Sequence, residues 1–294
     1  MVMLAGDAGE NWLEQLPSLV KFYEKKWQIK CLNPFSLSYN YVLPVETADG
    51  KLAVLKISFP NNSEFDNELE TLRFYNGVGS VKVLQEDREN QVILLERAMP
   101  GMRIGDVQPD RKQISLVSEV IKKIHQPILL QNNYQFPTLT DWAKVFERYR
   151  QNFDVKSGPI PAGMFEEAEE IFAQHSTNNE SSFLLHGDLH NDNIILSERG
   201  WLVIDPKGVV GNQEFEVGTY LRNPLTDLPE GSNYKLIEKN RISQFSEELG
   251  LDKKSLLQWT LANAVISLLW FLEDEKEFKK IYLHNAELIS EIQF

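Results

Sequence analysis

An α+β fold with two lobes is predicted from three features of this 294-residue sequence. Roughly the first 100 residues hold five runs with strand character and one helical run inserted after the third of them. Helical periodicity dominates the remainder, which a single hairpin interrupts. Pro100 and Gly101 break the pattern between the two parts, and the chain is long enough for two compact units. We therefore expect lobes at residues 1–97 and 98–294.

The N-terminal part begins with an amphipathic helix over residues 11–26, where apolar residues recur near helical spacing. Pro17 lies inside this run, so we expect it to kink or divide the helix. Strand-like runs follow at residues 27–32, 39–46 and 52–58. Asp49 and Gly50 form a typical hairpin turn between the last two runs.

Lys56 lies among apolar residues in the third strand-like run, so its ammonium group needs a polar partner or a solvent-facing edge. The next helical run, residues 62–75, carries four acidic residues. Among them Glu68 lies beside the apolar stripe, which makes it the candidate partner of Lys56. A solvated lysine and a solvated carboxylate remain the alternatives.

The order of the remaining elements supports the two-lobe plan. Two more strands are predicted at residues 81–85 and 92–96, before the break at Pro100. Helices are then predicted at residues 111–126, 140–152, 164–175, 253–273 and 277–292. The fourth of these is apolar enough to be a buried core helix.

Composition narrows the class of partner and the compartment. The chain has 30 Lys+Arg against 43 Asp+Glu, and its net charge of −13 argues against nucleic acid or an anionic membrane and permits a cationic substrate. The single cysteine, Cys31, excludes an internal disulfide and fits a reducing compartment. We see no secretory signal and no run of ~18 apolar residues, so we expect a cytoplasmic protein. Oligomeric state is not readable from the sequence.

Residues 183–208 combine two histidines, three aspartates and two asparagines with short apolar runs. Asn193 follows Asp188 by five residues, and Asp205 follows a predicted hairpin at residues 194–204. A base and two hard oxygen ligands are the groups that phosphoryl transfer from a magnesium nucleotide needs. Asp188 is then the candidate base for a hydroxyl acceptor, and Asn193 and Asp205 are the candidate Mg²⁺ ligands. Lys56, held by Glu68, would contact the nucleotide phosphates.

The sequence HGDLHNDNIIL followed by WLVIDPKGVVG resembles the signature of the aminoglycoside phosphotransferases, which have a protein-kinase-like fold. Within that family the chain is similar to the streptomycin 6-kinase and hydroxyurea phosphotransferase group. The similarity extends to WLEQLP, AVLKIS, LLERAMPG, FPTLTDWA and LRNP (residues 221–224), and so covers most of the chain.

The resemblance implies a protein-kinase-like bilobal fold with a small antiparallel-sheet nucleotide-binding lobe (residues 1–97) and a helical catalytic and substrate-binding lobe (residues 98–294). It implies ATP and Mg²⁺ as cofactors, with Asp188 as base, Asn193 and Asp205 on the metal, and Lys56 with Glu68 at the phosphates. The backbone from Glu96 to Ala98 would be the hinge that meets adenine. The acceptor would be a small hydroxyl compound, an aminoglycoside or hydroxyurea, and the role antibiotic resistance or metabolism of a related compound.

Two features depart from the protein-kinase pattern. The loop at residues 33–40 has no glycine to cover the phosphates, so Ser36, Ser38 and backbone amides are the candidates to reach them. The sequence DPKG replaces DFG, retaining Asp205 without the phenylalanine switch. The hypothesis that follows is a site that needs no activation-loop modification.

Two other classes of function compete with the kinase hypothesis. In a metal hydrolase, the alternating His186, Asp188, His190 and Asp192 would bind zinc or iron, with further ligands from elsewhere. The two histidines are more simply explained as groups that brace the catalytic loop. The other class is a nucleotide-binding pseudoenzyme or scaffold, which retention of all five polar positions disfavours.

Acidic residues in the C-terminal part of the chain are the candidates for the acceptor site. Glu214, Glu216 and the acidic run at residues 273–277 are candidate ligands for a cationic acceptor. Solvated surface carboxylates and a helix N-terminal role for Glu216 are the alternatives. A small neutral alcohol or a metabolite is equally compatible with the sequence.

Overall fold

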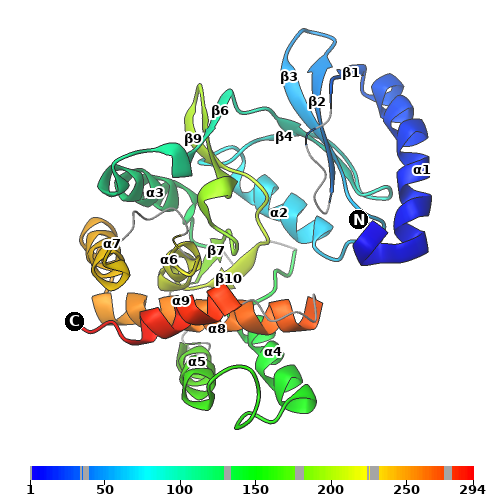
Figure 1. The fold of residues 1–294 in the computed structure, drawn as a ribbon. Helices are drawn as coiled ribbons and strands as arrows, with labels where there is room; N and C mark the ends of the chain where they lie inside the picture. Colours follow the sequence, from blue (N-terminus) through cyan, green and yellow to red (C-terminus); the bar gives the residue numbers. More distant parts are fainter. Residues whose placement is uncertain are drawn as a thin grey trace. The chain divides into compact units, whose positions relative to one another are not determined.

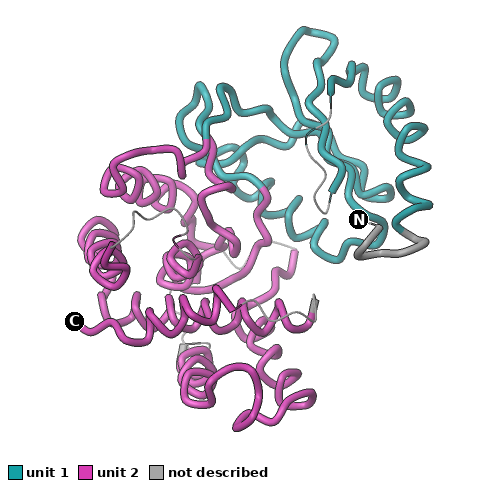
Figure 2. Tube along the Cα trace, viewed as in Figure 1, with its two compact units in different colours: residues 1–102, 196–204 teal, residues 103–195, 205–294 magenta. Residues whose placement is uncertain are grey.

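The computed structural model describes residues 2–33, 35, 40–128, 134–175, 182–223, 225, 232–274 and 280–294. The chain divides into two compact units (Figure 2), residues 1–102 with 196–204, and residues 103–195 with 205–294. Residues 196–204, most of the predicted hairpin, therefore belong to the first unit, whereas the lobe expected at residues 98–294 included them. The α+β class predicted from the sequence is confirmed.

The first unit is built on a five-stranded antiparallel sheet of order β1-β2-β3-β5-β4 (Figure 1). Its elements are α1 (Val2–Lys26), β1 (Ile29–Cys31), β2 (Tyr41–Thr47), β3 (Leu52–Ile57), α2 (Phe65–Tyr75), β4 (Val83–Asp87) and β5 (Val92–Glu96). A three-stranded sheet of order β6-β8-β9 follows, with β6 (Pro100–Arg103), β8 (Ile194–Ser197) and β9 (Gly200–Val203). Strand β6 was not predicted.

Strand β5 shows how the two helices of this unit cover opposite faces of the sheet. Val92 and Leu94 pack in a cluster with the α1 residues Trp12 and Leu16. Ile93 and Leu95, which alternate with these two residues along the strand, pack in a separate cluster with residues of α2. This alternation is the two-residue period of a strand buried on both faces. Helix α1 also continues through Pro17, so of the two effects expected there, a kink or a division, the division is excluded.

The second unit is mainly helical, with one small sheet. Its elements are α3 (Asp110–Ile124), α4 (Leu139–Asn152), α5 (Ala162–His175), β7 (Phe183–Leu185), β10 (Val209–Gly211), α6 (Gln213–Leu221), α7 (Tyr234–Leu249), α8 (Lys253–Asp274) and α9 (Lys280–Ser290). Strands β7 and β10 pair antiparallel, a pairing that the expectation of one hairpin missed. Thr138 caps α4 through a capping box with Asp141.

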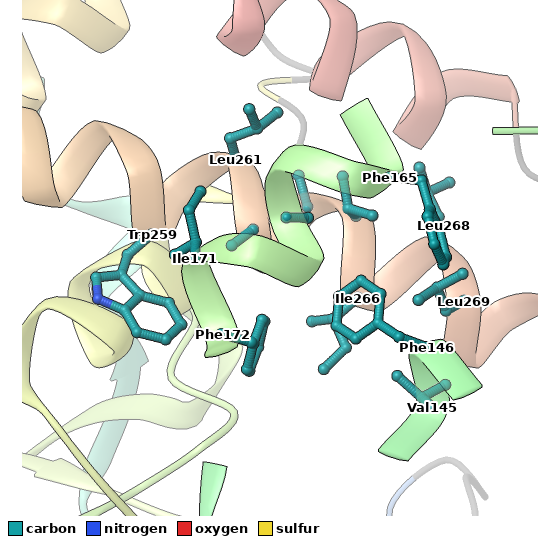
Figure 3. Packing of buried hydrophobic residues seen from close by; sticks show 14 of the residues in the cluster. Val145, Phe146, Phe165, Ile171, Phe172, Trp259, Leu261, Ile266, Leu268 and Leu269 are labelled. Carbon is teal, nitrogen blue, oxygen red and sulfur yellow. The ribbon is translucent and has the colours of Figure 1, made fainter. Parts of the chain in front are cut away.

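Helix α8 is the centre of the core of the second unit. Figure 3 shows aromatic and aliphatic side chains of α4, α5 and α8 directed toward one another, including Phe146, Phe172 and Trp259. In the described part of the chain, α8 alone is long and apolar enough to cross a membrane. However, 67% of its most apolar stretch is buried inside the protein. This burial fits the core helix that the sequence predicts.

Helix α6 approaches α8 closely because Gly218 has no side chain. A Cβ added at Gly218 would lie 2.6 Å from the carbonyl oxygen of Trp259 and 2.9 Å from Nδ2 of Asn263. The amide of Asn263 also donates to the carbonyl of Phe215, so α6 is hydrogen-bonded to α8 as well as packed on it. Helix α6 is thereby a fixed platform beside β7 and the loop that follows it.

Glu238 on α7 is a buried carboxylate whose titration affects stability. Its Oε1 accepts a hydrogen bond from Arg241 at 3.1 Å, while Oε2 is buried without a partner among the described residues. Burial raises the pKa of Glu238 to about 7, against the opposing effect of Arg241. The folded protein therefore holds a proton that the unfolded chain releases near pH 4.5, so stability falls as pH rises from about 4.5 to 7.

We expect Glu238→Gln to remove this part of the pH dependence, because the amide keeps an acceptor for Arg241 and has no proton to lose. Relative to wild type, the variant should gain stability between pH 5 and 8, by up to about 3 kcal/mol. Urea unfolding at several pH values measures the difference. Glu247→Gln on the exposed face of the same helix is the matched control. Parallel pH profiles for Glu238→Gln and wild type would contradict the assignment.

Candidate active site

The loop after β7 carries the sequence HGDLHNDN and is fixed by its short apolar residues. Leu184 and Leu185 of β7 are fully buried, as is Leu189 inside the loop. Gly187 has φ +79°, and a Cβ there would lie 2.8 Å from the ring of Trp142 and 3.1 Å from Val209. Only glycine fits this left-handed turn, which brings Asp188 directly after the end of the strand.

Glu216 on α6 forms hydrogen bonds with the backbone of the first residues of this loop. Its side chain is fully buried, and its two carboxylate oxygens accept backbone N–H groups from His186 at 2.5 Å and Gly187 at 3.2 Å. Glu216 was a candidate ligand for a cationic acceptor, but in the structure both of its carboxylate oxygens bind backbone amides of this loop. Burying a carboxylate is tolerated here because backbone donors pair with each oxygen.

Of the two aspartates in this loop, Asp188 is the less exposed, with 25% of its side chain accessible against 61% for Asp192. Its Oδ1 accepts a hydrogen bond from Nη2 of Arg222 at 2.8 Å, and its Oδ2 lies 4.0 Å from Nε2 of His190. Burial alone would raise the pKa of Asp188, but the positive charges of Arg222 and Lys207 hold that pKa below its ordinary value. Asp188 is thus ionised at neutral pH and able to accept a hydrogen bond.

His186 and His190 both accept backbone N–H groups within the loop. Nδ1 of His186 accepts from Asp188, and Nδ1 of His190 accepts from Asp192, each at 3.2 Å. Burial lowers the pKa of His190 despite the neighbouring Asp188 carboxylate, so its imidazole is neutral at pH 7. A neutral imidazole can accept such a bond at the nitrogen that carries no proton.

Asn193 and Asp205, the predicted metal ligands, both belong to the second unit. The amide nitrogen of Asn193 donates to the backbone oxygen of Asp188 at 2.9 Å, which leaves its Oδ1 as the oxygen for a ligand. Asp205 is exposed and has a positive φ of 55°, a backbone strain often found at functional positions. An amide oxygen and a carboxylate are a donor set that fits Mg²⁺.

The metal-hydrolase alternative finds no support in this geometry. Within the described residues, no three His, Cys, Asp or Glu side chains gather in a way that would hold a metal ion. His186 is fully buried, and the exposed Asp192 pairs with Arg103 at 2.9 Å. The alternating residues of the loop therefore do not form a zinc or iron site.

The ion pair expected between Lys56 and Glu68 is present in the first unit. Nζ of Lys56 lies 2.7 Å from both carboxylate oxygens of Glu68, and the two side chains are 5% and 8% exposed. Lys56 alternates with the residues of β3 that pack beneath α1, so its side chain extends toward α2. The strand period thus explains why a lysine is accepted in an apolar run.

Glu96, the first residue of the predicted hinge, forms hydrogen bonds with other residues of the first unit. The backbone N–H of Glu96 donates to the carbonyl of Lys82 at 2.8 Å, so this amide is not free to meet adenine. The carboxylate of Glu96 accepts from Nε and Nη2 of Arg199, in the turn between β8 and β9. Ala98, two residues after Glu96, is buried. Ser36 and Ser38 lie outside the described residues.

One residue near Asp188 was not assigned a role from the sequence. Arg222 was quoted only within the LRNP motif, yet it makes the closest side-chain contact to the candidate base. The available signal was a cation in the turn that ends the helix carrying Glu216. Glu214 is half-buried, and the acidic run at 273–277 is described only in part, where Glu273 pairs with Arg148 at 2.7 Å.

A family model described as "Aminoglycoside/hydroxyurea antibiotic resistance kinase" matches residues 29–275. The chain belongs to this family. A streptomycin 6-kinase of Streptomyces griseus is 27% identical over 274 residues, which cover 92% of this chain and 87% of that protein. A hydroxyurea phosphotransferase of Kitasatospora aureofaciens is 28% identical, over 92% of this chain and 77% of that protein.

A solved structure of an amicoumacin kinase in complex with AMP-PNP, Ca²⁺ and its ligand matches this fold with a TM-score of 0.68. Its sequence is 14% identical, and the match covers 94% of this chain and 92% of that one. The protein-kinase-like fold that the sequence predicts is therefore confirmed. With the family established, this antibiotic resistance kinase is a phosphotransferase that acts on a hydroxyl group of a small molecule.

Proposed function

We propose that this kinase transfers the γ-phosphoryl group of ATP, bound with Mg²⁺, to a hydroxyl of a streptomycin-like aminocyclitol or of hydroxyurea. The observation that carries the proposal is the Asp188 carboxylate, with Oδ1 held by Arg222 and Oδ2 at 4.0 Å from Nε2 of His190. An ionised oxygen in such a position can accept the proton of an acceptor hydroxyl.

In this proposal the acceptor oxygen forms a bond to the γ-phosphorus, the bond from that phosphorus to the bridging oxygen of ADP breaks, and Asp188 takes the hydroxyl proton. Asn193 and Asp205 would hold Mg²⁺, which neutralises phosphate charge when bound. Lys56, fixed by Glu68, would bind phosphate oxygens, since a lysine with a fixed ammonium group suits that task. We further propose that the reaction occurs in the cytoplasm, consistent with a single cysteine.

The two acceptors are proposed together because the relatives that act on them are almost equally similar, at 27% and 28% identity. The structure weakens one argument for a cationic acceptor, since Glu216 is buried and bonded to the loop backbone. Arg222 and Lys207 also lie close enough to Asp188 to lower its pKa. These charges favour an acceptor that is uncharged next to its reacting hydroxyl, as hydroxyurea is.

The test is ADP release by the purified protein with Mg²⁺ and ATP, in the presence of streptomycin, hydroxyurea or other aminoglycosides. We expect one acceptor class to raise ADP release well above the rate with ATP alone, with one phosphoryl group added to the acceptor by mass spectrometry. Release at the background rate with both proposed acceptors, while other hydroxyl compounds react, would reject these acceptors and keep the kinase assignment. Background rates with every hydroxyl compound tested would favour a nucleotide-binding pseudoenzyme.

Asp205→Asn is expected to weaken nucleotide binding only when Mg²⁺ is present. The amide keeps the shape of the side chain but loses the negative charge that the metal requires. We expect the Kd for ATP measured by calorimetry with Mg²⁺ to rise by roughly tenfold or more, which is about 1.4 kcal/mol. Binding in EDTA should stay as in wild type, and Asp192→Asn is the matched control. If the Kd for ATP is unchanged both with Mg²⁺ and in EDTA, Asp205 is not a metal ligand.

A further inference from the structure

The two oxygens of the Asp188 carboxylate have different surroundings. Oδ1 accepts from Nη2 of Arg222 at 2.8 Å. Oδ2 accepts no side-chain hydrogen bond from a described residue, and Nε2 of His190 lies 4.0 Å from it. One oxygen is thus fixed by the protein, and the other is left for a ligand.

Arg222 is well placed to hold Asp188 because its own backbone is fixed by helices of the second unit. It is the C-cap residue of α6, and its N–H donates to the carbonyl of Gly218 at 2.9 Å. Its carbonyl accepts from Nδ2 of Asn285, on α9, at 2.8 Å. Asn285 is in turn hydrogen-bonded to Tyr234 on α7. The guanidinium is therefore anchored at a junction of α6, α7 and α9.

The side chain of Arg222 is hydrogen-bonded to Asp188, and its charge also interacts with the buried carboxylate of Glu216. It is 11% exposed, and its Nη1 is buried without a hydrogen-bond partner among the described residues. Among those residues, its side-chain hydrogen bond is the one to Asp188. Burying a guanidinium with an unsatisfied nitrogen is unfavourable, so the position of Arg222 against Asp188 points to a role beyond stability.

We propose that Arg222 is a positioning residue for phosphoryl transfer, which locks Oδ1 of Asp188 so that Oδ2 faces the acceptor hydroxyl. This inference rests on the proposed function of Asp188 as the base. The planar guanidinium fixes both the distance and the direction of its bond, whereas a lysine ammonium would supply only a point charge. Rotation of the Asp188 carboxylate is thereby restricted, which keeps the base in a reactive geometry.

The first test compares Arg222→Gln and Arg222→Lys with wild type in steady-state kinetics. We expect Arg222→Gln to lower kcat by roughly 10- to 100-fold while KM for ATP stays within about twofold, because loss of orientation affects the reacting group and not nucleotide binding. Arg222→Lys should recover part of that loss. Arg150→Met, which removes an exposed pair with Glu169 in the same unit, is the control and should keep wild-type kcat.

The decisive test is a double-mutant cycle with Asp188→Asn. If Arg222 acts only through the carboxylate of Asp188, adding Arg222→Gln to Asp188→Asn should change the residual kcat by less than about threefold. A structural role for Arg222 would multiply the two losses, and that result would overturn the proposal. Thermal unfolding of each variant checks folding, and if Arg222→Gln does not fold, Arg222→Lys replaces it in the cycle.

Failure of this inference is distinguishable from failure of the proposed function. If Asp188→Asn keeps near-wild-type transfer, the base assignment itself is wrong, whatever Arg222 does. If Asp188→Asn is inactive while Arg222→Gln keeps wild-type kcat, the proposed function stands and the positioning role is rejected. A rise in KM for the acceptor with unchanged kcat would also reject it, because it would make Arg222 a binding residue.

Discussion

Asp188→Asn is expected to lower kcat for phosphoryl transfer by roughly 10²- to 10⁴-fold, the usual contribution of a positioned general base. Asparagine preserves the size of the side chain, and its Oδ1 can still accept the hydrogen bond from Arg222. The variant loses the ionised oxygen that would take the proton of the acceptor. Because Asp188 is not among the proposed ligands of the nucleotide or the metal, the Kd for ATP with Mg²⁺ should stay close to the wild-type value.

Two measurements make this prediction specific. Nucleotide binding by calorimetry shows whether the variant keeps an intact donor site, and thermal unfolding shows whether it folds. Asp192→Asn is the matched control, because it makes the same change four residues later on a side chain that is 61% exposed. Transfer at near the wild-type rate by Asp188→Asn would show that another group accepts the proton.

Much of the candidate site was predictable because its residues are close in sequence and local rules fix them. The five-residue step from Asp188 to Asn193 spans a loop whose shape follows from Gly187 and the buried Leu189. Strand β5 was predicted with its observed limits, Val92–Glu96, since both faces are apolar and a turn precedes it. Glu68 was predictable as the partner of Lys56 because the helix period places it, among the four acidic residues of its helical run, beside the apolar stripe.

The rest depends on tertiary contacts that sequence patterns do not encode. Glu216 has the appearance of an acidic residue at a helix start, and only the packing of α6 beneath β7 shows that backbone amides use both of its oxygens. Arg222 lies 34 residues after Asp188, so no local spacing rule joins them. The hydrogen bond from the amide of Glu96 to the carbonyl of Lys82, at the start of the predicted hinge, likewise joins two segments that no sequence pattern pairs.

Glu68→Ala is expected to destabilise the protein by about 3–5 kcal/mol, because it leaves the ammonium of Lys56 buried without its carboxylate. Both side chains are less than a tenth exposed, and the two short bonds at 2.7 Å compensate for the loss of hydration. The same change should also reduce transfer, since Lys56 would lose the group that holds it at the phosphates. Urea unfolding and steady-state kinetics measure the two effects separately.

The double variant Lys56→Met with Glu68→Leu separates stability from catalysis. Replacing a buried ion pair by apolar side chains of similar size is often neutral or stabilising, so we expect a free energy of unfolding at or above the wild-type value. The pair lies beside an apolar cluster of α2 and β5, which suits such a replacement. Transfer should nevertheless be lost, with weaker ATP binding, because the cation proposed to bind the phosphates is removed. A folded double variant that transfers phosphate at the wild-type rate would show that the pair is only structural, and one as unstable as Glu68→Ala would show that the site does not accept apolar packing.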